Sequence, residues 1–221
     1  MRFLTFALAA TCLLAPPSFA SPANPANGAE YLTLQRAQDV QTNGKRVEVI
    51  EFFMYHCPAC YALEPALAAW VKKQGDKILF RRIHIPHIPD KDPEAHLFLT
   101  LEAMGLADSM HDKVLATWHV EHLRLKDDND NLNWALKNGI DKARFLDAYN
   151  SFGTMTKLRN LLRVSANYQV DSTPTLVVAG HYLSNPALVN TANPRLPQQE
   201  VLNATLQVLD ALVAKAAKEA P

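Results

Sequence analysis

The sequence of 221 residues has few cysteines and no net charge. Its three cysteines are Cys12, Cys57 and Cys60, and its 22 basic residues balance 22 acidic ones. A zero net charge gives no reason to expect nucleic acid or an anionic surface as a partner. Secreted proteins that rely on disulfides for stability usually carry more cysteines. The hydrophobic core must therefore stabilise this protein, and the cysteines point to another purpose.

Long apolar runs are lacking beyond the start of the chain. Residues 3–15 are mostly apolar, but they fall short of the roughly 20 residues that a membrane-spanning helix needs. A basic residue precedes this run and the small residues around Ala20 follow it, which is the pattern of a secretory signal. We therefore expect residues 1–20 to be a cleaved signal peptide and the rest to be exported and soluble. A membrane anchor and a lipid attached at Cys12 are the alternatives.

Cys57 and Cys60 stand where an apolar strand is expected to give way to a helix. The apolar run at residues 49–55 predicts a buried strand. Pro58 suits the first position of a helix, because its missing N–H would have no partner there. A disulfide between two residues so close would restrain little of the unfolded chain, since this stabilisation grows with loop length. Redox chemistry is therefore a better explanation of the pair than structural cross-linking.

The expected position of Cys57 favours its thiolate. The first turn of a helix has free backbone N–H groups and a partial positive charge, which together lower the pKa of a thiol. The thiolate is the species that attacks a disulfide or leaves from one. Stabilising it favours the reduced pair, so the disulfide form becomes a stronger oxidant. Cys60, one turn deeper, should be shielded and act as the resolving thiol.

The wider pattern predicts an α/β fold. Strands expected at residues 46–55 and 77–85 flank a helix at 58–73, which makes a βαβ unit with a right-handed crossover. Residues 93–168 have helical apolar spacing throughout. Further strands are expected at 31–36, 175–179 and 182–183, and a final helix at 197–218. Helices enclosed between strand-forming segments indicate an insertion into an α/β domain.

A second motif lies far along the chain, at residues 170–175, where Pro174 precedes an expected strand. A proline there cannot extend the hydrogen-bond ladder and suits an edge or a cis turn. Taken with the Cys-x-x-Cys junction, the chain resembles the thioredoxin-like fold and the DsbA family of bacterial periplasmic thiol:disulfide oxidoreductases. The resemblance rests on residues 51–64, on 170–174 and on the helical block between them. The fold class it implies is α/β, thioredoxin-like, with a helical insertion domain.

The resemblance also implies domains, roles and partners. The expected domains are a signal peptide at 1–20, a thioredoxin-like domain at 21–90 and 169–221, and an inserted helical domain at 91–168. Cys57 should form a mixed disulfide that Cys60 resolves, with Pro174 cis and facing the pair. The implied partners are unfolded or folding exported proteins and a membrane re-oxidant of the DsbB type, linked to quinone. We expect a periplasmic monomer that needs no cofactor.

One position departs from the family pattern. Members commonly carry His where this chain has Ala59, so we hypothesise that this protein is a weaker oxidant. His56 could compensate for that loss, although an ordinary surface histidine is the favoured interpretation. The backbone of Thr173 could pair with an extended substrate, and its side chain could tune reactivity. The candidates for redox tuning or substrate binding are therefore Pro58, Ala59, His56, Thr173 and Pro174.

Two carboxylates near the pair carry different expectations. Glu51 lies in an otherwise apolar strand, and a buried carboxyl there would have a raised pKa and could relay the proton of Cys60. A carboxylate that reaches solvent or pairs with a lysine is the alternative for Glu51. Glu64, one turn after Cys60, is expected to be a solvated helix residue.

Other functions stay open at this point. A metal site could combine the two cysteines with histidines from His84-x-x-His87 or His119-x-x-His122, but a second Cys-x-x-Cys is lacking and no metal is expected. Within redox chemistry, a disulfide isomerase or reductase is the main alternative. A polypeptide-binding chaperone module without redox activity is the other.

Overall fold

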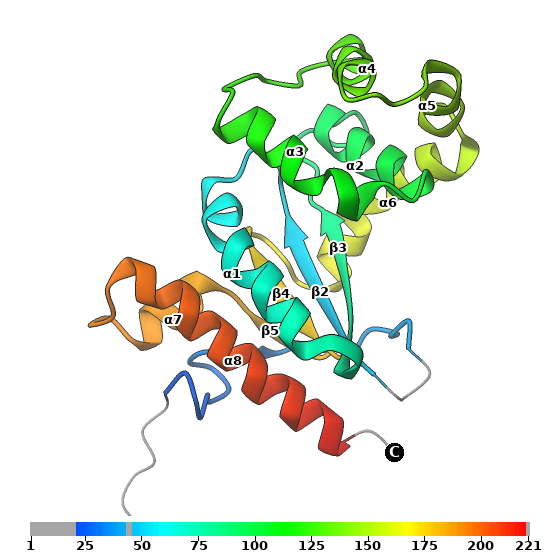
Figure 1. Ribbon diagram of the computed structural model, residues 1–221. Coiled ribbons are helices and arrows are strands. Elements are labelled where there is room, and N and C mark those ends of the chain that lie inside the picture. Colours follow the sequence, from blue (N-terminus) through cyan, green and yellow to red (C-terminus); the bar gives the residue numbers. More distant parts are fainter. Residues whose placement is uncertain (1–20, 43–45, 220–221) are drawn as a thin grey trace, which may run out of the picture.

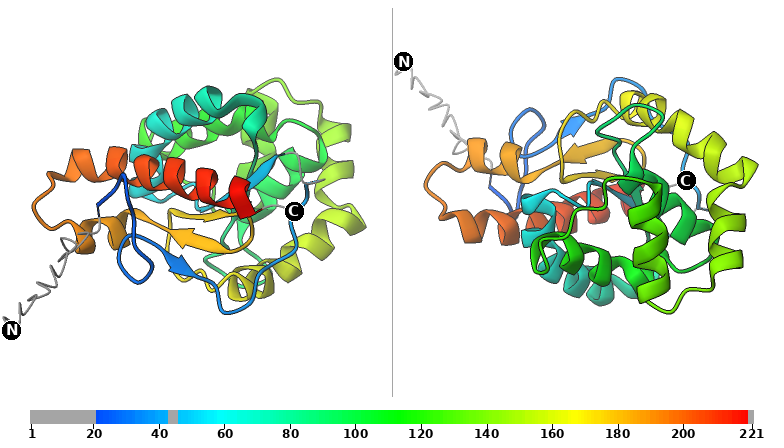
Figure 2. Two further views of the ribbon diagram at one scale, coloured as in Figure 1. Left: turned by 90° about the horizontal axis from the view of Figure 1, so that it is seen from below. Right: turned by 90° about the horizontal axis from the view of Figure 1, so that it is seen from above.

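The computed structural model describes residues 21–42 and 46–219, so the expected signal peptide lies outside the described residues. A five-stranded sheet is covered by helices on both faces (Figure 1, Figure 2). The elements in chain order are β1 (Leu32–Thr33), β2 (Val47–Phe53), α1 (Pro58–Gln74), the short 3-10 helix η1 (Gly75–Lys77), β3 (Ile78–His84), α2 (Pro93–Ala103), α3 (Ala107–His119), α4 (Asp128–Lys137), α5 (Lys142–Tyr149), α6 (Phe152–Asn167), β4 (Thr175–Val178), β5 (Tyr182–Ser184), α7 (Pro186–Ala192) and α8 (Gln198–Glu219).

The sheet has the strand order β1-β5-β4-β2-β3. β2 and β3 run parallel and are joined by α1, which is the expected βαβ unit. β4 runs antiparallel to β2 on its other side, and β5 and β1 complete the sheet as antiparallel strands. The predicted strands and the predicted first and last helices are confirmed. The edge strand β1 is shorter than residues 31–36, because just two of these residues pair with β5.

Alternate residues of the strands face two different cores, as the two-residue repeat of a strand requires. Val49 and Val178 pack with Leu67 of α1 and Leu209 of α8 in one cluster. Residues of the other face, among them Phe52, join a second cluster with the helices that follow β3. Figure 2 shows α1 and α8 on one side of the sheet and α6 on the other.

The helices α2–α6 lie between β3 and β4 in the chain and gather at one end of the sheet (Figure 1). This confirms a block of helices inserted into an α/β unit, whereas the domain boundaries near residues 90 and 168 stay a prediction. Four of these helices start at a residue whose side chain accepts a backbone N–H of the first turn, which satisfies a group that the helix itself leaves unpaired. These caps are Asp92, Asp127, Asp141 and Ser151. No helix among the described residues has the length and apolar character needed to cross a bilayer.

Candidate active site

The two cysteines lie where β2 passes into α1. The chain leaves β2 in a turn that is closed by a hydrogen bond from the Cys57 N–H to the Met54 carbonyl, at 3.2 Å. Helix α1 then starts at Pro58, as predicted, with Cys57 as its N-cap residue. Both sulfurs are thiols in this structure. Cys60 is 2% exposed, which confirms that it is shielded.

The two thiols have opposite electrostatic environments. The Cys57 sulfur accepts the Cys60 backbone N–H at 3.3 Å, and its thiol reaches the Thr173 carbonyl at 3.5 Å. The hydrogen bond from the Cys60 thiol, helped by those from the Thr173 side chain and from the backbone N–H groups of Cys60 and Ala59, outweighs burial and lowers the pKa of Cys57 to about 5. Burial, and then the neighbouring Cys57 sulfur, raise the pKa of Cys60. One sulfur is therefore ionised at neutral pH while the other keeps its proton.

The second motif meets the cysteines in space. The peptide bond between Thr173 and Pro174 is cis, as the resemblance implied. The Thr173 carbonyl faces the Cys57 thiol, and β4 begins directly after the proline. Cys57 and Thr173 are 116 positions apart in the chain, so two distant segments form one surface. Pro58 and Ala59 are exposed beside it.

Glu51 is buried in β2 behind the cysteines, with 1% of its surface exposed. Its partner is an arginine, because Arg82 stands opposite it in the parallel register of β2 and β3 and donates from Nε at 2.9 Å. Burial raises the pKa of Glu51 to about 7, although the charge of Arg82 opposes this shift. The expected buried carboxyl with a raised pKa is confirmed. The alternatives of solvent contact or a lysine partner are wrong.

The expectation that Glu64 is solvated is wrong. Its carboxylate is 2.7 Å from the guanidinium of Arg82 and 3.3 Å from Nε2 of His111. Burial raises its pKa, but the hydrogen bond from His111 and the charge of Arg82 lower it overall. The side of α1 that carries Glu64 faces β3 and α3 instead of solvent. The adjacent arginines Arg81 and Arg82, inside an otherwise largely apolar strand, were the sequence signal that could have revealed this cluster.

His56 is also not a free surface histidine. Its Nδ1 lies 2.7 Å from one carboxylate oxygen of Glu94, and its backbone N–H donates to the other at 2.9 Å. The hydrogen bond to Glu94 raises the pKa of His56, while burial works against it. Burial raises the pKa of Glu94, yet the hydrogen bond from His56 and the charges of His56 and His84 together outweigh it, and the pKa falls to about 2. Glu94 was not among the predicted site residues, since 38 residues separate it from His56 in the chain.

One histidine of each pair considered for metal binding contacts the backbone of Tyr55 instead. His84 is fully buried and its Nε2 accepts the Tyr55 N–H at 3.2 Å. Nε2 of His119 lies 2.8 Å from the Tyr55 carbonyl. Within residues 21–42 and 46–219, no group of three or more His, Cys, Asp or Glu side chains is arranged to hold a metal ion.

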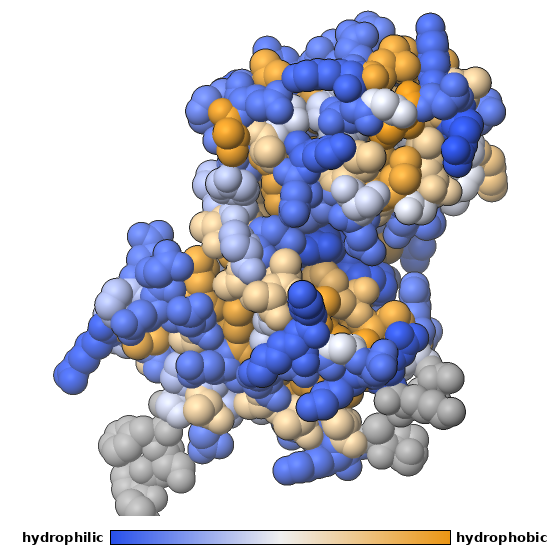
Figure 3. All heavy atoms as spheres, viewed as in Figure 1, coloured by the Kyte–Doolittle hydropathy of each residue, from blue (hydrophilic) through white to orange (hydrophobic). Residues whose placement is uncertain are grey.

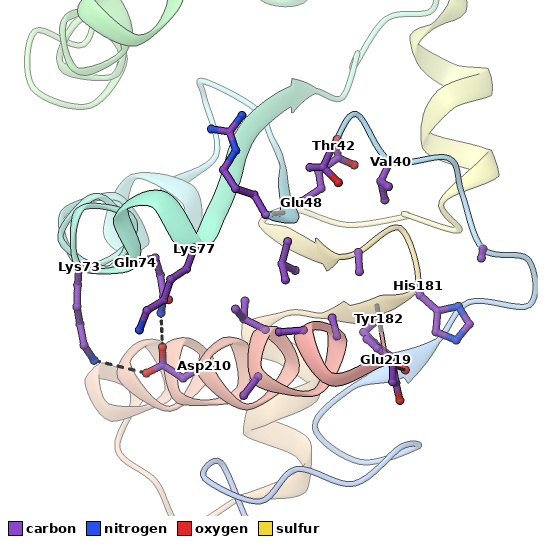
Figure 4. Close-up of a pocket in the computed structure, with 18 residues that line it drawn as sticks. Val40, Thr42, Glu48, Lys73, Gln74, Lys77, His181, Tyr182, Asp210 and Glu219 are labelled. Atoms are coloured by element: carbon purple, nitrogen blue, oxygen red, sulfur yellow. Dashed lines mark hydrogen bonds and ion pairs between the residues drawn. The ribbon is translucent and has the colours of Figure 1, made fainter. Parts of the chain in front are cut away.

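Two cavities differ in their relation to the cysteines. A pocket of about 640 Å³ adjoins His56 and Pro58 and is walled by Trp118 and His119. The surface narrows between α2–α6 and the rest of the molecule, and α1 begins near this narrowing (Figure 1, Figure 3). A larger cavity of about 920 Å³ lies between α8, the C-terminal end of α1 and the start of β2, which are the ends of these two elements farthest along the chain from the cysteines (Figure 4). Neither Cys57 nor Cys60 lines it, so it is separate from the dithiol.

Known proteins provide the comparison for this geometry. No family model matches the chain. The thiol:disulfide interchange protein DsbA of Burkholderia cepacia is 34% identical over 212 residues, which cover 96% of this chain and 95% of that protein. The chain belongs to the DsbA family. DsbA of Bordetella parapertussis is also 34% identical, over 191 residues that cover 85% of this chain and 90% of the relative.

Solved DsbA structures agree with this assignment. The crystal structure of Pseudomonas aeruginosa DsbA matches with a TM-score of 0.76 at 30% identity, covering 87% of this chain and 95% of that one. The thioredoxin-like fold with a helical insertion, predicted from the resemblance, is confirmed. This DsbA-family protein is a thiol:disulfide oxidoreductase.

Proposed function

We propose that this DsbA-family protein works as a dithiol oxidase that donates the Cys57–Cys60 disulfide to unfolded or folding exported polypeptides. The observation that carries the proposal is the environment of Cys57, whose pKa is lowered to about 5 at the start of α1. A stabilised thiolate favours the reduced pair, so the disulfide gives up its bond readily. A disulfide reductase would need a pair whose disulfide form is favoured over its reduced form, so that the reduced pair gives up its electrons readily.

The exchange proceeds in two steps that conserve electrons. A client thiolate attacks the Cys57 sulfur, a client–Cys57 disulfide forms, and Cys60 leaves as a thiolate that takes up a proton. A second client thiolate then attacks the client sulfur of this bond and releases Cys57 as a thiolate. The client loses two electrons and the enzyme pair gains them. In re-oxidation Cys57 attacks the partner's disulfide, and Cys60 resolves the resulting bond.

Glu51 is the proposed proton relay for Cys60. A group that exchanges a proton near neutral pH works best when its own pKa is close to the ambient pH, and the pKa of Glu51 is raised to about 7. Arg82 keeps its side chain in place through the 2.9 Å contact. His56, the residue before Cys57, is the proposed tuning group and takes over part of the role that the family gives to the position of Ala59.

Clients are proposed to lie as extended chains across the surface formed by Cys57, Thr173 and Pro174. Pro58 and Ala59 are exposed at its rim and are available to a client. Membership of the family also supports a periplasmic location, and we propose that the protein is a monomer. Its re-oxidising partner is proposed to be a membrane protein of the DsbB type that is linked to quinone.

A Cys60→Ala variant tests the proposal, because it cannot resolve a mixed disulfide. Mixed with a reduced, unfolded client that has been activated at one cysteine, it should accumulate a covalent adduct at Cys57 that reducing agent releases. Cys57→Ala is the control and should form none. Wild type, supplied in the disulfide form, should convert the reduced client to its disulfide form in one turnover.

Other outcomes would overturn the proposal. A client that is held but never oxidised, equally by wild type and Cys57→Ala, indicates a chaperone. Reshuffling of a scrambled client by the reduced enzyme, without net oxidation of a reduced client by the disulfide form, indicates an isomerase.

A further inference from the structure

The turn that precedes Cys57 needs partners that the sheet does not supply. Residues 54–57 form this turn, and the Cys57 N–H closes it on the Met54 carbonyl at 3.2 Å. The polar backbone groups of the two central residues, Tyr55 and His56, lie beyond the end of β2. Tyr55 has no exposed surface. Buried backbone N–H and C=O groups that lack a partner are costly, so this turn depends on side chains.

Three side chains supply these partners. Nε2 of His84 accepts the Tyr55 N–H at 3.2 Å, and Nε2 of His119 donates to the Tyr55 carbonyl at 2.8 Å. A carboxylate oxygen of Glu94 accepts the His56 N–H at 2.9 Å. His84 ends β3, whereas Glu94 belongs to the first turn of α2 and His119 ends α3. Two of the three contacts therefore come from the inserted helices.

Both contacts from the insertion are themselves anchored. The second oxygen of Glu94 is 2.7 Å from Nδ1 of His56, so one carboxylate holds the backbone and the ring of the same residue. The His119 ring stacks on Tyr61 of α1 with ring centres 4.5 Å apart and planes 13° from parallel. These paired contacts leave the turn little freedom to rotate.

We propose that Glu94 and His119 are positioning residues for disulfide exchange, which hold the turn at Tyr55 and His56 and thereby fix Cys57 at the N-terminal end of α1. The proposal rests on the proposed function, because it concerns the same reactive sulfur. The Cys57 sulfur is 3.3 Å from the Cys60 N–H, and a small shift of the turn would lengthen this contact. The insertion thus contributes directly to the reactivity of a cysteine that it does not carry.

The test compares alanine and glutamine at the two positions. Glu94→Ala and His119→Ala remove the contacts, whereas Glu94→Gln keeps an acceptor for the His56 N–H and His119→Gln keeps a donor for the Tyr55 carbonyl. His96→Ala is the matched control, because Nε2 of His96 makes a similar 2.8 Å contact with the Tyr149 carbonyl inside the insertion. The readouts are the Cys57 thiolate pKa, from ultraviolet absorbance, and the equilibrium constant with glutathione, with thermal unfolding recorded for each variant.

We expect each alanine variant to raise the Cys57 pKa and to make the enzyme about three- to tenfold less oxidising, the range of one net hydrogen bond. The glutamine variants should stay closer to wild type than the alanine variants, although Glu94→Gln also removes the negative charge that raises the pKa of His56. His96→Ala should lose thermal stability without changing either readout of the site.

Unchanged readouts in the alanine variants would overturn the inference, and so would equal shifts in the glutamine variants or in His96→Ala. These outcomes are distinct from failure of the proposed function, in which wild type itself would not oxidise a client.

Discussion

At the scale of single residues, the site depends on giving two identical thiols different surroundings. Cys57 receives hydrogen bonds from the start of α1, which lower its pKa, whereas burial raises the pKa of Cys60. Glu51 sits behind them as a carboxyl whose burial keeps its pKa near neutrality. The low pKa of Cys57 and the raised pKa of Glu51 can each be tested by a single substitution.

Ala59→His should make the enzyme more oxidising. Ala59 is exposed, so an imidazole can be accommodated and its positive form would stabilise the nearby thiolate. Each unit by which the Cys57 pKa falls further should change the equilibrium constant with glutathione about tenfold. The measurement is an equilibrium titration against glutathione, with Ala62→His as a control that adds the same side chain elsewhere on α1. An unchanged or less oxidising Ala59→His variant would refute the hypothesis.

Glu51→Gln should slow the resolution of a Cys57–glutathione mixed disulfide by Cys60. Loss of a positioned proton acceptor typically costs about 100-fold, and the dependence of the rate on a group with pKa near 7 should disappear. Rapid-mixing kinetics across the neutral pH range would show both effects. Glu48→Gln is a matched control, since Glu48 is buried in the same strand and paired with Arg81 at 3.0 Å. A similar loss in both variants would contradict a relay specific to Glu51.

At the scale of elements, α1 connects the site to the far side of the protein. Its N-terminal end carries the cysteines, and its C-terminal end is joined to α8 through Asp210 (Figure 4). Asp210 accepts the indole N–H of Trp70 at 2.8 Å and also contacts Gln74 and Lys73. This contact stabilises the packing of two helices on one face of the sheet, away from the dithiol.

Asp210→Ala should lower the free energy of unfolding by about 1 kcal/mol, the usual net contribution of a hydrogen bond that is replaced in part by water. Asp210→Asn keeps an acceptor for Trp70 and should lose less. Denaturant unfolding measures the loss, and the Cys57 pKa should not change in either variant. A shift in that pKa would show that the two ends of α1 are coupled.

At the scale of the whole molecule, the reactive surface lies where the thioredoxin-like sheet and α1 meet the inserted helices (Figure 1). The β4 side contributes Thr173 and Pro174, and the insertion contributes Glu94 and His119. The redox state of the pair should therefore affect the stability of the entire fold. This effect depends on pH in a direction that follows from the Cys57 pKa.

Near neutral pH the Cys57 thiolate should stabilise the reduced form relative to the disulfide form. The reduced form also loses the cross-link, which is a separate contribution to its stability. A free thiol has a pKa of about 8.5, and the folded protein lowers that of Cys57 to about 5. The contribution of the thiolate is complete above the unfolded pKa, declines by about 1.4 kcal/mol per unit as pH falls through this window, and is absent below the folded pKa. The raised pKa of Glu51 has the opposite effect on stability, which it lowers as pH rises. Because Glu51 is present in both forms, it does not account for a difference between them.

Denaturant unfolding of the reduced and disulfide forms at a series of pH values measures this difference. Cys57→Ser forms no disulfide with Cys60, so it is compared with the reduced wild type; its stability should lack the decline that the thiolate causes, because a hydroxyl does not ionise in this range. A constant difference between the two forms of wild type across the window would show that the thiolate is not stabilised by folding.

Much of this arrangement was predictable because its signals are local. The apolar run before Cys57, the proline after it and the helical spacing of residues 93–168 each report on a few neighbouring residues. Burial of Glu51 was one of two interpretations that its place in an apolar strand left open, and the structure confirms it. Glu64 was assigned wrongly because its exposure depends on how α1 packs against β3 and α3, which the composition of the helix does not reveal.

The sequence by itself determined the strand–turn–helix that presents Cys57, the βαβ unit and the presence of an inserted helical block, since these follow from short-range backbone preferences and apolar periodicity. Only the tertiary structure decided that Arg82 pairs with Glu51 and Glu64, and that Glu94 and His119 hold the turn before Cys57. These contacts join residues 18 to 64 positions apart. Strand register and helix packing bring them together, and neither is encoded in any single stretch of the chain.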